Sequence, residues 1–303
     1  MPVIEGQTFM TRLTTPAGRA AASLLLLALA AAPAAQAAGG CDGPWPVAET
    51  SRTFIDPARN DREVPARLFH PGIAAGVGGQ PVAGCAFPIL AFGHGFTIPE
   101  TRYRWLALAL AAQGFVVALA ATETGLSPSH GALADDLAFL PRALVRDPTF
   151  ASVAGTPHAI GGHSMGGGAA LLAVASAPRT GALFALAPAE TNPSAIAAAA
   201  SIRASALLVT GSRDCVTPTA QHAGPMFAAL ATPPDRRQLL DIAGGSHCQF
   251  SDGWFTCTLG EASCGGGATL PAAEQQGQVL QALLPLLVDR LVADALFVDD
   301  FGA

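Results

Sequence analysis

The chain has 303 residues, and half of them are hydrophobic, which is enough apolar material for a sizeable core. Its formal net charge is −6, and all 16 of its basic residues are Arg. An acidic chain without a basic patch argues against binding to nucleic acid.

Residues 1–37 have the composition of a secretory signal peptide. Arg12 and Arg19 precede an apolar run over residues 20–32, and Ala35-Gln36-Ala37 matches the small-residue cleavage pattern. The apolar run is too short to span a bilayer, and no later run approaches that length. The sequence therefore predicts an exported protein, periplasmic or extracellular, without stable membrane insertion.

The leader has two alternative interpretations. Translation from Met10 would give a shorter basic leader. Cleavage before Cys41 would give a lipoprotein acylated on that cysteine, although the residue three positions earlier is Ala and not the usual Leu. Removal of residues 1–37 leaves 266 residues and a formal charge of −7, because one Glu and two Arg are lost. Residues 38–303 have a typical size for a single α/β domain.

Apolar strand-like runs alternate with helix-like segments along the mature chain. Residues 41–65, rich in Pro and charge, are predicted to wrap the domain surface, and the Gly-rich residues 72–84 to form a surface loop. Nearly continuous apolar strands separated by helices predict an α/β fold with a mostly parallel central sheet and helices on both faces. The predicted strands are 87–92, 115–120, 158–161, 182–186, 206–210 and 238–242, and the predicted helices are 101–113, 133–146, 169–175, 219–230 and 272–292.

The segment Gly162-His163-Ser164-Met165-Gly166 lies between an apolar strand and a helix-forming run. Strand, sharp turn and helix are the context in which Gly-x-Ser-x-Gly forms a nucleophile elbow. The glycines accept strained backbone and close packing, which leaves the hydroxyl of Ser164 above the sheet. Because the chain contains 33 Gly, a serine that only forms a turn or caps the helix is the alternative.

A serine hydroxyl is a poor nucleophile near neutral pH, so Ser164 needs a base and a group that orients the base. Two histidines follow Ser164 in the chain. His222 falls in a predicted helix, where a solvated surface residue is the simpler interpretation. His247 follows the strand 238–242 through a glycine loop, which is where a general base is expected. His247 is therefore the predicted base.

Asp214 directly follows the strand 206–210 and is the predicted acid. Its alternative role is an Asx turn or a helix cap. Asp241 would lie inside a strand and Asp235 in a Pro-rich loop. Glu190 follows another strand and is the main rival.

Two backbone N–H groups are predicted to form an oxyanion hole. One belongs to Met165, the residue after the nucleophile, and the other to Phe96 in the glycine loop after the strand 87–92. His94 and His163 lie beside glycines in turns, and we expect both to pack structurally.

These elements resemble the α/β-hydrolases, and within them the dienelactone hydrolase-like branch that includes cutinases, poly(ethylene terephthalate) hydrolases and chlorophyllases. The resemblance implies a carboxylic ester hydrolase that works through an acyl-enzyme, with a small-molecule or polymeric ester as substrate and no cofactor or metal. Ser164 would attack, His247 would shuttle the proton and Asp214 would hold the histidine. The specific elements are residues 162–168, Gln113-Gly114-Phe115-Val116-Val117, His94-Gly95-Phe96 and Leu186-Ala187-Pro188.

One element departs from the polyester hydrolases that the chain resembles. In those enzymes a Trp follows the Pro of the Ala-Pro element and flanks the ester, whereas this chain has Ala189 and then Glu190. The change removes an aromatic clamp and argues against activity on aromatic polyesters. Candidate substrate contacts are Phe96, Ala189, Glu190 and Trp254, the last with a buried structural role as its alternative.

All six cysteines follow residue 37, and an even count in an exported chain indicates disulfides. The absence of a Cys-x-x-Cys pair argues against zinc. Some secreted members of the family carry a link between the acid and base loops, which implies Cys215–Cys248 here. Cys257–Cys264 would then close a short loop, and Cys41–Cys85 would hold the N-terminal segment.

Two other functions fit the same residues. The first is a lipase, peptidase or acyltransferase that uses the same triad, although no long lid insertion is evident. The second is a binding module with a silent site, which would require a missing triad member. No oligomeric state is predicted.

Overall fold

The computed structural model describes residue 41 and residues 43–293. The predicted signal peptide and the alternative start at Met10 lie outside these residues. No helix in the described part of the chain is long and apolar enough to cross a membrane.

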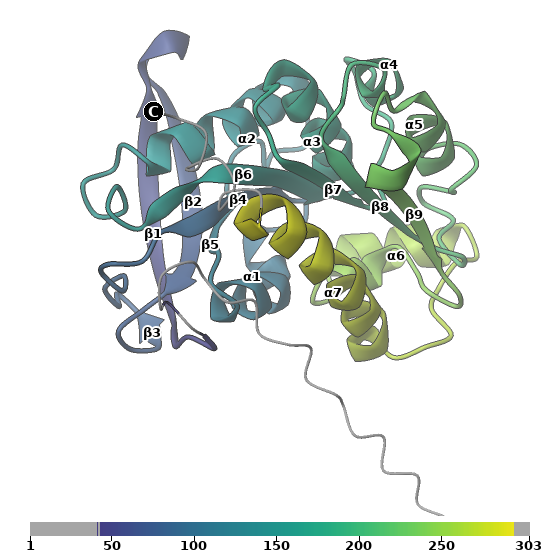
Figure 1. The fold of residues 1–303 in the computed structure, drawn as a ribbon. Helices are drawn as coiled ribbons and strands as arrows, with labels where there is room; N and C mark the ends of the chain where they lie inside the picture. The colour runs from purple at the N-terminus through teal and green to yellow at the C-terminus, as the bar shows by residue number, and fades with distance from the viewer. Residues whose placement is uncertain (1–40, 42, 294–303) are drawn as a thin grey trace, which may run out of the picture. The chain divides into compact units, whose positions relative to one another are not determined.

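The centre of the fold is a nine-stranded sheet in the order β3-β1-β2-β5-β4-β6-β7-β8-β9 (Figure 1). The six strands from β5 to β9 in this order are parallel, whereas β2 pairs antiparallel with both β1 and β5. The strands are β1 Val47–Asp56, β2 Arg62–Pro71, β3 Gly76–Val77, β4 Phe87–Gly93, β5 Val116–Ala120, β6 Ala154–His163, β7 Ala182–Leu186, β8 Ser205–Gly211 and β9 Arg237–Ile242.

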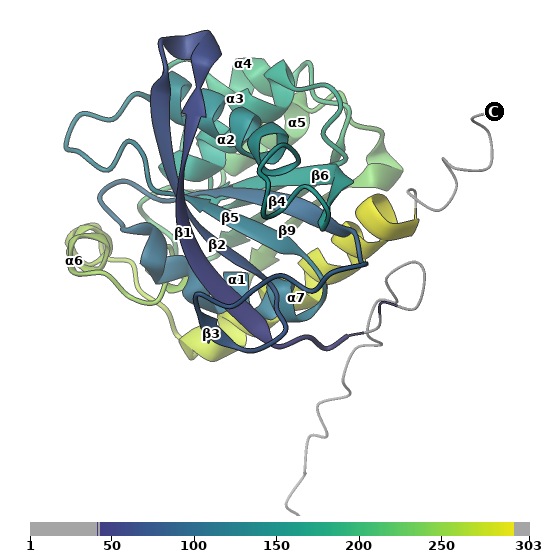
Figure 2. The ribbon, with the colours of Figure 1, turned by 90° about the vertical axis from the view of Figure 1, so that its left-hand side faces the viewer.

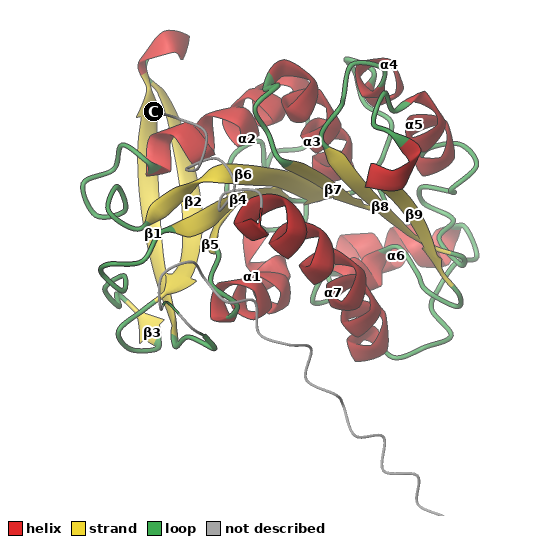
Figure 3. Ribbon diagram, viewed as in Figure 1, coloured by secondary structure: helices red, strands yellow, loops and turns green. Residues whose placement is uncertain are grey.

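Helices cover both faces of the sheet, so the α/β-hydrolase architecture predicted from the sequence is confirmed (Figure 3). The strands β5 and β7 are apolar along their length, β8 is apolar over its centre, and all three are fully buried because each is covered on both sides. One core lies under α2 to α5, and the other lies under α1 and α7. The helices are α1 Arg104–Ala112, α2 His130–Leu144, α3 Met165–Ser176, α4 Ala195–Ala199, α5 Ala223–Ala229, α6 Phe255–Ser263 and α7 Ala272–Val288.

The N-terminal part of the mature chain differs from the prediction. Residues 41–65 do not simply wrap the surface, because β1 and the start of β2 form a long antiparallel ladder at one end of the sheet (Figure 2). Residues 72–84 likewise contain the short strand β3. The charges that suggested a surface segment belong to half-solvated strands, where Glu49 and Arg67 form an ion pair of 2.8 Å.

The helix α6 was not predicted from the sequence. Most of its surface faces solvent, and Phe255 and Leu259 are 76% and 58% exposed. A short helix without a buried apolar stripe has no periodic signal that a sequence analysis can detect.

Candidate active site

The predicted site residues come together at one edge of the sheet. Ser164 follows β6, Asp214 follows β8 and His247 follows β9, while Phe96 lies in the loop after β4. Because these four strands are parallel, their carboxyl ends lie along the same edge, where ligands bind in α/β folds.

Ser164 occupies a strained turn between β6 and α3. Its backbone has φ 54° and ψ −119°, a conformation that non-glycine residues rarely adopt. The turn is held on both sides, because the Ser164 N–H donates to Leu186 O at 2.9 Å and the N–H of Ala189 donates to Ser164 O at 2.9 Å. Ala189 therefore lies directly beside the candidate nucleophile.

The glycines around the turn are required by close backbone contacts. A Cβ on Gly162 would lie 2.2 Å from the carbonyl oxygen of Gly166, and a Cβ on Gly166 would lie 2.2 Å from that of Gly93. The elbow and the loop after β4 are therefore packed backbone against backbone.

Asp214 and His247 form a buried hydrogen-bonded pair. His247 Nδ1 lies 2.8 Å from Asp214 Oδ2. The other carboxylate oxygen accepts the N–H groups of Val216 and Thr217, both at 2.8 Å. The Asx turn considered as an alternative role is thus present, and Oδ2 remains available to the histidine.

Thr217, which the sequence analysis did not single out, supports the same carboxylate. Its hydroxyl lies 2.9 Å from Asp214 Oδ2 and 3.0 Å from His247 Nδ1. Burial by itself would raise the pKa of Asp214, but the hydrogen bond from His247, its charge and the two bonds from Thr217 outweigh burial and lower it. Asp214 is therefore ionised at neutral pH.

The hydroxyl of Ser164 makes no hydrogen bond to another described residue. The ring of His247 nevertheless lies 4.7 Å, between ring centroids, from the ring of His163, the neighbour of Ser164 in sequence. Hydrogen bonds between a nucleophile and its base are often longer in enzymes without substrate.

The rival residues are engaged elsewhere. The carboxylate of Glu190 accepts the hydroxyl of Ser194 and, at 3.0 Å, the N–H of Ile196, so it caps the start of α4. The N–H of Glu190 donates to His222 Nδ1 at 2.9 Å. Asp241, in β9, accepts the hydroxyl of Thr210 at 2.8 Å.

A second carboxylate supports the base loop from α6. Glu261, which is only 6% exposed, accepts the backbone N–H of His247 at 2.6 Å. The sequence analysis missed this residue because nothing in a short helix marks one Glu as buried. The helix that carries Glu261 therefore takes part in placing His247.

Two of the three predicted disulfides are wrong. The structure links Cys215 to Cys264 and Cys248 to Cys257, and only Cys41–Cys85 agrees with the prediction. Cys257 lies in the first turn of α6 and Cys264 caps its end. Seven residues of helix separate them by about 10 Å, which is beyond the reach of a disulfide. One end of α6 is instead bonded to the loop that carries Asp214, and the other end to the loop that carries His247.

The loop after β4 has an exposed outer side and a buried inner side. Phe96 is 47% exposed, and its N–H makes no hydrogen bond within the described part of the chain. The ring nitrogens of buried His94 lie 2.9 Å from Gly95 O and 2.7 Å from Thr122 O. The N–H of Gly95 donates to the hydroxyl of buried Tyr103 at 2.9 Å.

Trp254 is partly buried and precedes α6. The guanidinium of Arg102 lies over its ring, 4.8 Å from the centroid. The Thr97 hydroxyl is 2.9 Å from that of Thr256, which places the start of α6 beside the loop of Phe96.

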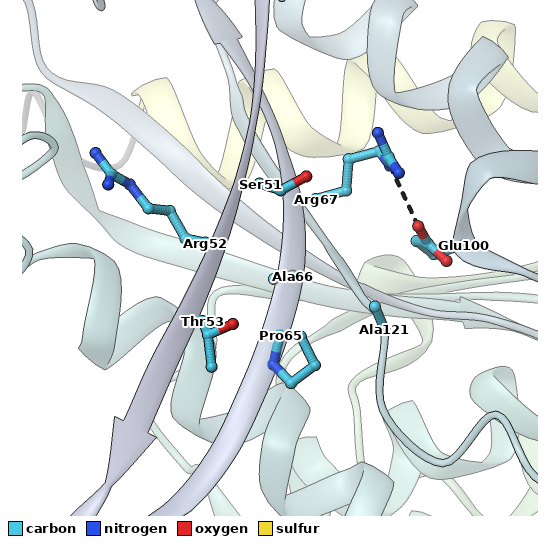
Figure 4. A pocket seen from close by; sticks show the side chains of 8 residues that line it. All are labelled: Ser51, Arg52, Thr53, Pro65, Ala66, Arg67, Glu100 and Ala121. Atoms are coloured by element: carbon cyan, nitrogen blue, oxygen red, sulfur yellow. Dashed lines mark hydrogen bonds and ion pairs between the residues drawn. The ribbon is translucent and has the colours of Figure 1, made fainter. Parts of the chain in front are cut away.

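A cavity of about 180 Å³ opens near β1 and β2 (Figure 4). The Arg67 side chain at its wall is already paired with Glu49 and Glu100. None of the predicted site residues lines this cavity. Over residues 41 and 43–293, no group of three or more His, Cys, Asp or Glu is arranged to hold a metal ion.

Comparisons with known proteins all match this chain to ester hydrolases. A family profile described as PET hydrolase-like matches residues 80–259. The chain is 28% identical over 242 residues to a bis(hydroxyethyl) terephthalate hydrolase of Streptomyces coelicolor, covering 78% of this chain and 76% of that protein. It is 26% identical over 248 residues to a cutinase of Thermobifida fusca, covering 81% of each chain. It is 28% identical over 243 residues to cutinase est1 of Thermobifida alba, covering 75% of this chain and 79% of that protein.

Proposed function

The chain belongs to the PET hydrolase-like family of α/β-hydrolases and is a carboxylic ester hydrolase, and we propose that Ser164, His247 and Asp214 are its catalytic triad. The observation that supports this proposal is the buried 2.8 Å hydrogen bond between Asp214 and His247, at the sheet edge where Ser164 adopts its strained turn. A serine on a strained turn becomes a nucleophile when a base can take its proton and an acid orients that base.

In the proposed reaction the Ser164 hydroxyl attacks the ester carbonyl while His247 takes its proton. The tetrahedral intermediate collapses, the carbonyl re-forms and the leaving alcohol receives the proton from His247. Water then attacks the acyl-enzyme with His247 again as the base, which releases the carboxylic acid and restores Ser164. Asp214 holds the imidazole and stabilises its transient positive charge.

The negative charge of each tetrahedral intermediate requires hydrogen-bond donors. We assign this role to the backbone N–H groups of Phe96 and Met165. Loss of one such donor costs about 3 kcal/mol of transition-state stabilisation in characterised enzymes.

The proposed substrate is a small-molecule or polymeric carboxylic ester. Phe96 and Ala189 are the proposed contacts, because Phe96 is exposed at the site and Ala189 binds the backbone of Ser164. The carboxylate of Glu190 is occupied in capping α4, and Trp254 stacks with Arg102, so both are weaker candidates. Since Ala189 offers no aromatic surface, aliphatic esters should be preferred to aromatic polyesters.

We also propose that the protein is exported, to the periplasm or beyond the cell. The leader over residues 1–37 and the three disulfides support this location. The mature chain, residues 38–303, is proposed to act as one domain.

The test is hydrolysis of p-nitrophenyl acetate and butyrate by the wild type and by Ser164→Ala. We expect the substitution to lower kcat at least about 10⁴-fold, because the serine supplies the covalent step. Ser251→Ala is the matched control, since Ser251 is a buried serine of the base loop whose hydroxyl donates to Cys248 O. Equal rates for the wild type and Ser164→Ala would disprove the proposal.

A fluorophosphonate probe gives a second readout. It should label the wild type and Ser251→Ala but not Ser164→Ala. Failure to label folded wild-type protein would favour a silent binding module instead.

A further inference from the structure

The single tyrosine of this chain lies under the candidate site. Tyr103 ends the 3₁₀ turn Glu100–Tyr103 and is fully buried. Its hydroxyl accepts the N–H of Gly95 at 2.9 Å and lies 2.9 Å from His163 Nδ1. One oxygen atom therefore joins the loop after β4 to the residue that precedes the nucleophile.

The direction of these two hydrogen bonds follows from the available protons. The Gly95 N–H can only donate, so it occupies a lone pair of the Tyr103 oxygen. The phenol proton is then free to donate to His163 Nδ1, which makes His163 an acceptor at that nitrogen. This arrangement gives the Gly95 N–H and the phenol proton an acceptor each, and it places the proton of a neutral His163 ring on Nε2, which is buried and has no hydrogen-bond partner among the described residues.

The electrostatics agree with that assignment. Burial, and secondarily the nearby His247, lower the pKa of His163 well below its usual value. Burial also raises the pKa of Tyr103, so the phenol keeps its proton. When His247 becomes positively charged during the reaction, the ring 4.7 Å away adds no repulsion.

The position of Tyr103 is set by rigid surroundings. Its ring packs against Phe92 of β4 with 4.9 Å between centroids, and it leads directly into α1. The Gly95 carbonyl accepts the N–H of Ile98 at 3.0 Å, so both polar groups of the Gly95 backbone are held from the inner side. A Cβ on Gly95 would lie 3.0 Å from Ile98 Cδ1, 3.1 Å from His163 Nδ1 and 3.2 Å from the Tyr103 oxygen, so the loop fits tightly here.

We infer that Tyr103 is a positioning residue for ester hydrolysis: its hydroxyl holds the Gly95 peptide, and with it the adjacent N–H of Phe96, in register with the nucleophile elbow. The inference rests on the proposed function, in which Phe96 supplies an oxyanion donor. On its outer side the loop is held by the Thr97 hydroxyl, 2.9 Å from that of Thr256 in a contact that is exposed, whereas Tyr103 is the buried anchor of its inner side. A misplaced donor weakens transition-state binding without changing substrate binding to the same extent.

The test is Tyr103→Phe, which keeps the buried ring and removes only the hydroxyl. Thr232→Val is the matched control, because it also removes a buried hydroxyl with two hydrogen-bond partners, here the backbone oxygens of Ile202 at 3.2 Å and Ala204 at 2.7 Å. Those partners precede β8 and so lie at the opposite edge of the sheet from the site.

We expect kcat for p-nitrophenyl butyrate to fall about 10- to 100-fold in Tyr103→Phe, with KM changed by less than about 3-fold. Affinity for a boronic acid, which mimics the tetrahedral intermediate, should fall in parallel with kcat. Thr232→Val should lower the melting temperature but leave kcat unchanged.

Hydrogen exchange provides a readout that is independent of activity. A peptide covering residues 93–98 should exchange faster in Tyr103→Phe and at the wild-type rate in Thr232→Val. The role of Tyr103 would be overturned if this peptide exchanged at the wild-type rate in Tyr103→Phe. It would also be overturned if the wild type were active and Tyr103→Phe had the same kcat. A folded wild type that hydrolyses no ester would overturn the proposed function instead, so the two failures are distinguishable.

Discussion

The two sides of the candidate site are built in different ways. The nucleophile side, formed by the elbow after β6 and the loop after β4, is made of glycines packed backbone against backbone. The acid–base side, formed by the loops after β8 and β9, has one such contact, since a Cβ on Gly211 would lie 2.5 Å from the carbonyl carbon of Gly245, but it adds side-chain hydrogen bonds and two disulfides to α6.

The difference indicates how each side responds to change. Packed backbone has no side chain that can rotate away, so one added carbon must displace a strand end or a loop. The acid–base loops have several anchors each, so the loss of one leaves others in place. The nucleophile side should therefore fail abruptly and the acid–base side gradually.

The largest effect is expected for Gly166→Ala. Its Cβ would lie 2.2 Å from Gly93 O and 2.6 Å from His94 O, both backbone atoms, so the loop after β4 must move. We expect kcat/KM to fall about 10³-fold and the free energy of unfolding to drop by about 3 kcal/mol. Ester hydrolysis and urea unfolding measure the two quantities.

Gly277→Ala is the control for this substitution. A Cβ at Gly277, in α7, meets no atom within 4 Å. The change should leave activity intact and stabilise the protein by about 0.4–1 kcal/mol. A Gly166→Ala enzyme as active as Gly277→Ala would contradict the account of the elbow.

An intermediate effect on kcat is expected when the disulfide Cys215–Cys264, at the end of α6, is removed. Cys215–Cys264 and Cys41–Cys85 close chain segments of 49 and 44 residues, so chain entropy predicts a similar stability loss for each, about 4 kcal/mol. Only the first holds a loop of the candidate site, the one that carries Asp214. Cys215→Ser/Cys264→Ser should therefore lower kcat about 10-fold, whereas Cys41→Ser/Cys85→Ser should not.

The two double variants should be assayed well below their melting temperatures. Peptide mapping without reductant checks the pairing itself. Equal kcat values for the two variants would show that the disulfide Cys215–Cys264 does not position the loop that carries Asp214.

The smallest effect is expected for Thr217→Val, which removes one anchor of Asp214. The pKa of Asp214 in the folded protein lies below its ordinary value. The ionised carboxylate therefore stabilises the fold fully at pH values above the ordinary pKa, and this stabilisation is lost as pH falls through the folded pKa. Without the hydroxyl the folded pKa should rise, and acid unfolding should begin at a higher pH.

Acid titration followed by circular dichroism measures this shift. Thr217→Ser keeps the hydroxyl and should behave like the wild type. An acid transition that Thr217→Val leaves unmoved would show that the hydroxyl does not stabilise the carboxylate.

Much of the fold could be predicted because its signals are local. The buried strands β4, β5, β7 and β8 are continuous apolar runs, and their predicted ranges agree with the structure to within one residue. The strands β1 and β2, toward one end of the sheet, were missed because a half-solvated strand carries the same charges as a surface loop.

The candidate site, like the fold, has parts that the sequence predicts from local signals and parts that it does not. The elbow motif and the order of Ser164, Asp214 and His247 are visible in the sequence, and the structure places Asp214 and His247 in contact. Their supports could not be identified, since Glu261 and Tyr103 act through hydrogen bonds between separate segments, and Thr217 contacts His247 as well as Asp214 only in the folded chain.

The sequence by itself determined what depends on neighbouring residues: the apolar strands, the glycine turn and the strained serine. Tertiary structure alone decided which cysteines bond, which carboxylate reaches the base loop and what holds the Gly95 peptide. The physical reason is that a turn or a strand is selected by local sterics and burial, whereas a cross-link or a buried hydrogen bond requires two distant segments to meet at a distance that no spacing along the chain encodes.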